Sequence, residues 1–119
     1  IKISVSIDVS NLKQAETFYI EALGCKKLRD QGEGMSVIST ENCDIYLQEK
    51  EAGTKPIPSD AVERNYGRHW TPVHLDFLTE NVDEAVKKII QLVANMKAEK
   101  VVIGVLLHIV RTHSVTDFV

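Results

Sequence analysis

The sequence predicts an α+β fold built from two copies of one strand-and-helix module. Alternating apolar and polar residues predict short strands, and apolar residues at helical spacing follow two of these strands. The second strand-and-helix pair repeats the first after a shift of seventy positions, which places Asn81 on Asn11, Ala85 on Ala15 and Phe77 on Ile7. The repeat indicates two related modules within one domain, residues 1–119.

The first module, residues 1–48, is predicted to run strand, helix, strand, strand, strand. Residues 1–9 alternate and place one face on the core side, with Ile3, Val5, Ile7 and Val9. Ser10 and Asn11 are candidate caps of a helix whose apolar stripe continues to Leu23 and ends at Gly24. Further strands are predicted at 25–29, 35–39 and 44–48, separated by polar turns.

A polar loop over residues 49–69, with Pro56 and Pro58, leads to the second module at 70–119. Residues 73–77 alternate, with Val73, Leu75 and Phe77 on the covered face and His74 and Asp76 on the other. Asn81 and Glu84 form a capping-box pattern before a helix whose apolar residues are Val82, Ala85, Val86, Ile89 and Val93.

Composition is that of an ordinary globular protein, with 44% hydrophobic and 26% charged residues. A formal charge of -3 without a basic cluster predicts that neither nucleic acid nor an anionic membrane is the main partner. No apolar run reaches the length of a membrane span. Cys25 and Cys43 form no zinc-binding pattern, so we expect reduced thiols in a cytoplasmic protein.

Two strings carry a family resemblance: FYIEALG at residues 18–24, and HWTPVHLDF at 69–77 before the capped helix. With the order of elements, they resemble the glyoxalase, bleomycin-resistance and extradiol-dioxygenase superfamily, the vicinal oxygen chelate proteins, over residues 1 to about 100. The resemblance implies one glyoxalase-like domain of paired βαβββ modules. These modules would form a cupped mixed sheet with the helices on its outer face and a ligand pocket inside, and the protein would be a homodimer.

Metalloenzymes of this superfamily hold a divalent ion through residues on the first, fourth, fifth and last strands. His74 matches the fifth-strand histidine, but Ser4 and Tyr46 occupy the first two positions, and neither is a usual ligand for such an ion. The resemblance therefore implies no catalytic metal and no cofactor, with His74 as a pocket-lining or hydrogen-bonded residue. Replacement ligands from Asp8, Gln48 and Asp76 stay open as an alternative.

The resemblance implies a pocket whose inner face presents Ser4, Ser6, Tyr46, His74 and Asp76, with Tyr66 and Trp70 at its rim. Trp70 is equally well interpreted as a packing residue beneath the loop. The expected function is binding of a small aromatic or cationic molecule without catalysis. Two alternatives stay open: a metal-dependent lyase, isomerase or dioxygenase, and a remnant that has lost its function.

Residues 101–119 depart from the superfamily pattern. Codons for residues 108–119, read from their third bases, can encode YCADPFGHGFC, which resembles the missing closing turn and strand. We therefore hypothesise a shift of reading frame between about Lys100 and His108, which sequencing of the DNA would test. The apolar tail is still expected to supply one or two strands, with His108 and His113 incidental. Incomplete closure predicts a homodimer, with or without exchanged elements.

Overall fold

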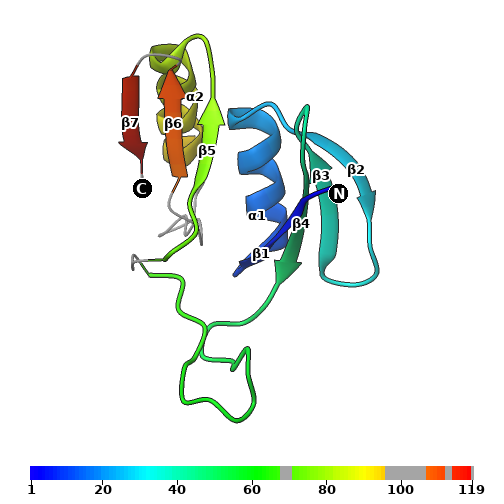
Figure 1. Ribbon diagram of the computed structural model, residues 1–119. Helices are drawn as coiled ribbons and strands as arrows, with labels where there is room; N and C mark the ends of the chain where they lie inside the picture. The colour runs from blue at the N-terminus through cyan, green and yellow to red at the C-terminus, as the bar shows by residue number, and fades with distance from the viewer. Residues whose placement is uncertain (68–70, 96–106, 112–113, 119) are drawn as a thin grey trace.

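The structure is a computed structural model of the 119-residue chain, and it describes residues 1–67, 71–95, 107–111 and 114–118 (Figure 1). The first module has the predicted order of elements. A π-helical turn, η1, extends its helix, and Gly24 follows with a positive φ of 71°. The elements are β1 (Ser4–Val9), α1 (Leu12–Thr17), η1 (Phe18–Ala22), β2 (Lys26–Asp30), β3 (Met35–Ser39) and β4 (Asp44–Glu49).

The first sheet has the strand order β1-β4-β3-β2, with β1 parallel to β4 and the other pairs antiparallel. α1 and η1 cover one face of this sheet and bury its apolar residues. This core contains Ile7, Val9, Ile38, Ile45 and Leu47 from the sheet and Phe18 and Tyr19 from the helix. The predicted alternation of residues 1–9 is thus confirmed for Ile7 and Val9, which leaves the polar residues of β1 on the opposite face.

Three strand starts were predicted too early, that of β2 by a single residue, since it begins at Lys26. β1 begins at Ser4 because its pairing with β4 starts there, opposite Asp44, and Ile1 and Ile3 are exposed. β5 (Leu75–Leu78) begins at Leu75, and Val73 is 63% exposed rather than covered. The His74 ring lies 3.0 Å from the carbonyl oxygen of Thr71, in the segment that precedes the strand.

The second sheet has the order β5-β6-β7. α2 (Val82–Asn95) follows β5, and β6 (Leu107–Arg111) and β7 (Ser114–Phe118) come from the tail, which confirms that the tail supplies strands. β6 runs parallel to β5 and antiparallel to β7. His108 therefore lies in a strand, whereas His113 lies outside the described residues.

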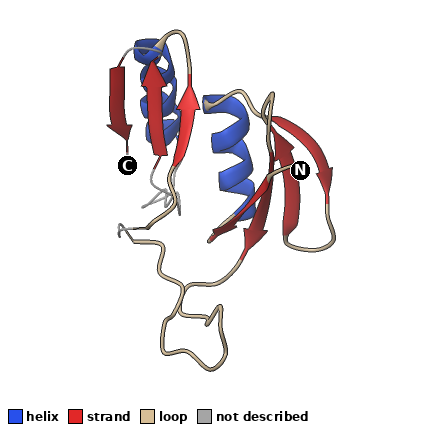
Figure 2. Ribbon diagram, viewed as in Figure 1, coloured by secondary structure: helices blue, strands red, loops and turns tan. Residues whose placement is uncertain are grey.

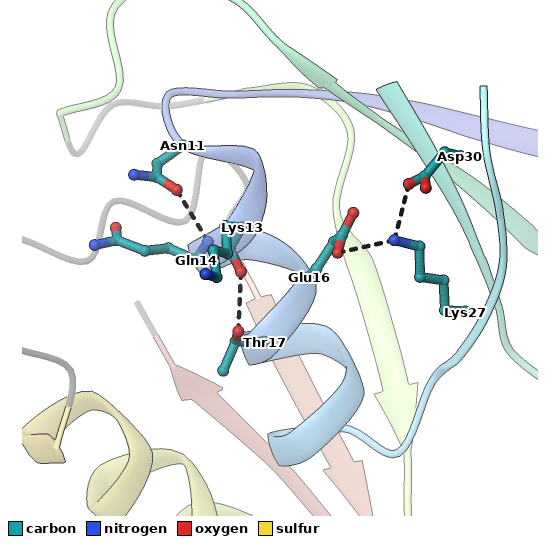
Figure 3. Close-up of polar contacts among 7 residues, drawn as sticks. All are labelled: Asn11, Lys13, Gln14, Glu16, Thr17, Lys27 and Asp30. Carbon is teal, nitrogen blue, oxygen red and sulfur yellow. Dashed lines mark hydrogen bonds and ion pairs between the residues drawn. The ribbon is translucent and has the colours of Figure 1, made fainter. Parts of the chain in front are cut away.

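The helix starts of the two modules have matching geometry. The side-chain oxygen of Asn11 accepts a 3.0 Å hydrogen bond from the backbone N–H of Gln14 (Figure 3), and Asn81 accepts the same bond from Glu84 at 3.0 Å. The seventy-residue repeat is therefore visible in the structure. One detail of the capping box differs, because the Asn81 N–H donates to the Thr79 hydroxyl while the Glu84 carboxylate lies 3.6 Å from the Lys88 ammonium.

These features confirm an α+β fold with mixed sheets, but the described strands do not close into one cup. α1 lies between β1 and β5, so the two sheets are separate (Figure 2). The modules meet where η1 packs against α2 and β5, and the Tyr19 ring of η1 lies 6.2 Å from the Phe77 ring of β5. Cys25 and Cys43 are free thiols. Among the described residues, no helix is long and apolar enough to cross a membrane.

Candidate ligand-binding face

The face of the first sheet that points away from α1 carries the polar side chains of β1 and β4. Strand partners in register point to the same side of a sheet, so Ser6 and Tyr46 are neighbours on this face, and Ser4 follows at the next position of β1. Three of the predicted site residues are thereby brought together. We call this surface the polar face and define it by Ser4, Ser6, Asp8, Arg29, Tyr46 and Gln48.

Arg29 is the residue of the polar face that the sequence did not reveal. A register irregularity between Lys27 and Arg29 turns Arg29 toward the polar face, although plain alternation would place both on one side. Lys27 instead faces α1, where its ammonium lies 3.3 Å from Glu16 and 2.8 Å from Asp30 (Figure 3). The bulge therefore decides which cation reaches the polar face, and a pattern of alternating residues does not predict a bulge.

The Arg29 guanidinium and the Tyr46 phenol form a pair at the middle of this face. Arg29 Nη2 donates a hydrogen bond of 3.2 Å to the Tyr46 hydroxyl, and the guanidinium carbon lies 6.0 Å from the centre of the ring. Arg29 Nε donates a further 3.2 Å bond to the side chain of Gln31. Both acceptors are neutral, so the positive charge of Arg29 is positioned without being neutralised.

Val37 shows that this pair lies over the sheet. Its register partners are Arg29 on β2 and Tyr46 on β4, so the three residues form one row across the strands. Val37 is 0% exposed, although it lies outside the core cluster on the α1 side. An apolar side chain on the open face is buried only when its neighbours cover it, so Arg29 and Tyr46, its partners on either side, contribute to the burial of Val37.

The loop over residues 50–67 contacts the polar face at Asp8, near the end of β1. Arg64 Nε donates a 2.8 Å hydrogen bond to the Asp8 carboxylate, and Arg64 Nη1 donates one of 3.1 Å to the Thr54 hydroxyl. The Tyr66 hydroxyl donates to the carbonyl oxygen of Lys50 at 2.7 Å. Burial raises the pKa of Tyr66, as does the nearby Asp8 carboxylate, while Arg64 opposes the shift. Sequence analysis missed Arg64, since its partner is fifty-six residues away.

The remaining predicted site residues are not gathered on this face. His74 precedes β5 and Asp76 lies within it, opposite His108 in the second sheet. β5 is on the far side of α1 from β1 (Figure 1), which separates these two residues from Ser6 and Tyr46. Trp70 lies outside the described residues.

A cleft of about 300 Å³ opens elsewhere, between the end of η1 and the start of α2. Its lining includes Glu21, Leu23, Phe77, Leu78, Glu84 and Lys88. Sequence analysis did not predict it, because its walls come from both modules and meet only through the packing of the helices.

The donors at the superfamily's metal positions do not fit a catalytic divalent ion. Ser4 and Tyr46 offer neutral hydroxyl groups, and the Tyr46 oxygen already accepts a hydrogen bond from a cation, Arg29. His74 directly precedes β5, a strand of the other sheet. Among the described residues, no three His, Cys, Asp or Glu side chains converge to hold a metal ion. We therefore derive no chemistry through a metal.

Comparison with known proteins places the fold in a family. The model of the glyoxalase-like domain matches residues 4–101, so the chain belongs to the glyoxalase-like domain family. A search of curated proteins finds no match.

Three solved structures share the fold. A lactoylglutathione lyase from Agrobacterium tumefaciens is 14% identical, with a TM-score of 0.50 over 77% of this chain and 69% of that one. An integron cassette protein from V. cholerae is 21% identical, with a TM-score of 0.51 over 76% of this chain and 66% of that one. The protein SMU.1112c is 17% identical, with a TM-score of 0.54 over 77% and 74% of the two chains. At these identities the likeness shows the fold alone.

Proposed function

We propose that this glyoxalase-like protein binds a small molecule on the polar face and does not catalyse a metal-dependent reaction. One observation carries the proposal: Arg29 and Tyr46 form a hydrogen-bonded pair in the row of the buried Val37. Binding sites combine an apolar surface with a few polar groups held in place before the ligand arrives. The polar face has both parts: the Tyr46 ring and the half-buried Met35 supply apolar surface, and Arg29, Tyr46 and Ser6 supply polar groups.

A fragment titration followed by backbone amide NMR tests this proposal. Fragments that bind should shift the amide signals of Ser6, Arg29, Val37 and Tyr46 more than those of α1. Tyr46→Phe should weaken the binding, whereas Lys27→Gln removes a charge from the opposite side of β2 and should leave it unchanged. Fragment shifts confined to the cleft between η1 and α2 would move the site there and contradict the proposal.

The metal-dependent enzyme is the competing function, and metal content separates the two. The purified protein is expected to contain no stoichiometric manganese, nickel, zinc or iron, and these ions should not raise its melting temperature. Stoichiometric metal that disappears in His74→Ala would overturn the proposal, because His74 is the one residue that matches a superfamily ligand.

We also propose that the chain forms a homodimer. β1 is an end strand of the first sheet, and the exposed residues Ile1 and Ile3 directly precede it. Strand edges and apolar side chains of this kind are commonly covered by a partner. Light scattering should therefore give twice the mass of the chain, and a monomer at micromolar concentration would contradict this.

A further inference from the structure

We infer that the ligand of the polar face is an organic carboxylate, which Arg29 binds through its free N–H groups. This inference rests on the proposed function and names the chemical class of the ligand. It replaces the cationic compound that the sequence left open by an anionic one, and the reason is the charge that the bulge in β2 brings to this face.

The charges of the polar face leave one cation over. Arg64 is paired with Asp8 at 2.8 Å. Lys26 and Asp44, at the edge of this face, lie in one row of the sheet through Ser39, roughly 10 Å apart, and together add no net charge. No carboxylate of the described residues forms an ion pair with Arg29. A ligand with one negative charge would neutralise Arg29, whereas a cationic ligand would be repelled by it.

The hydrogen-bonding groups around Arg29 match the same ligand. A guanidinium carries five N–H groups. Two of those of Arg29 donate to Tyr46 and Gln31, which leaves three for a ligand. The Tyr46 hydroxyl accepts from Arg29 and therefore keeps its own hydrogen for donation, and Ser6 is the next residue in this row. Guanidinium and carboxylate groups pair through two parallel hydrogen bonds, so a planar monoanion fits this set of donors.

The apolar part of the ligand has a surface to cover. Tyr46 is half-buried and pairs with Val37 of β3. Met35, two residues before Val37, lies on the same face of that strand. An aromatic or short aliphatic carboxylate can pack its apolar body against the Tyr46 ring while its carboxylate reaches Arg29. A phosphate dianion would require more positive charge than a single unpaired guanidinium supplies.

Four probes of one shape test the inference: benzoate, benzamide, benzylamine and phenyl phosphate, each titrated while backbone amide signals are recorded. Benzoate is expected to shift the signals of Ser6, Arg29 and Tyr46, and to bind more tightly than the other three. Arg29→Gln should weaken benzoate binding at least about tenfold, the usual effect of removing a charged hydrogen-bond donor. Arg29→Lys, which keeps the charge but loses the two parallel bonds, should give an intermediate affinity.

Lys27→Gln is the matched control, since Lys27 is a cation of the same strand that faces α1. Equal losses in Lys27→Gln and Arg29→Gln would overturn the inference, because they would indicate a general charge effect. Benzamide, benzylamine or phenyl phosphate binding as tightly as benzoate at this face would overturn the carboxylate assignment and keep the proposed binding function. If no probe or fragment shifts the polar face, the proposed function fails as well.

Discussion

The two modules start alike and continue differently. Each begins with a strand, an asparagine cap and a helix, and the two cap hydrogen bonds have the same length of 3.0 Å. In the first module the strand parallel to β1 is β4, the third strand after the helix. In the second, the strand parallel to β5 is β6, and it is followed by β7 at the edge.

Burial differs in the same way. The helix-facing residues of β1 and β4 are buried, with Leu47 at 0% exposure, whereas Leu75 and Phe77 of β5 are only half-buried. The starting unit is specified locally by its alternation and its cap, and so it repeats. The strand that completes each sheet is chosen by the residues that come after the helix. The two sheets therefore differ after the helix, while the strand-and-helix start is shared.

The largest expected effect of the difference in burial is on stability, when one leucine side chain is removed from each sheet. Leu47→Ala is expected to lower the free energy of unfolding by about 2–5 kcal/mol, because the site is fully buried. Leu75→Ala should cost less than half as much, since its side chain is half-buried. Urea unfolding measures both. Equal losses would mean that the second sheet is packed as tightly as the first.

The two caps should behave alike. Asn11→Ala and Asn81→Ala each remove one side-chain acceptor at a helix start, with an expected cost of about 1 kcal/mol. Asn11→Asp and Asn81→Asp keep an acceptor at each position and serve as controls with little loss. If only one of the two alanine substitutions lowered the free energy of unfolding, the two caps would differ in energy despite their equal hydrogen-bond lengths.

The ion pair between Asp8 and Arg64 should contribute less than one cap. Arg64 is 18% exposed and Asp8 38% exposed, so water and salt screen much of their attraction. A double-mutant cycle with Asp8→Asn and Arg64→Gln is expected to give a coupling energy of about 0.5 kcal/mol. Limited proteolysis should cut residues 50–67 faster in both variants. Unchanged cleavage would show that other bonds hold the loop to the first module.

The smallest effect is a loss of stability at alkaline pH that arises in the first module. Burial raises the pKa of the Cys25 thiol, and burial, together with the nearby Cys25, raises the pKa of Tyr19. As pH rises through the ordinary pKa of a thiol, about 8.5, the unfolded chain releases protons that the folded chain retains, so this stability is present below that range and declines as pH rises further. Urea unfolding between pH 7 and 10 should show this decline, with a shallower slope in Cys25→Ala. An unchanged slope in that variant would assign the loss to other groups.

Local patterns in the sequence determined the first module. Alternation predicted its strands to within a few residues, and Asn11 and Gly24 marked the helix ends. In the second module, the capping-box pattern of Asn81 and Glu84 predicted the helix start. Ser4, Ser6 and Tyr46 were predicted to share a face, and the register of β1 and β4 places them together. The strand alternation and the helix caps depend on neighbours within a few positions along the chain, which is why the residues alone reveal them.

Only the tertiary structure decided the composition of the polar face. A bulge in β2 brings Arg29 beside Tyr46, the loop delivers Arg64 to Asp8, and the packing of α1 keeps His74 and Asp76 away. Each of these outcomes depends on strand register or on contacts between residues far apart in the sequence. A shift of one residue in register exchanges the two faces of a strand, so periodicity alone does not determine which side chains reach a site.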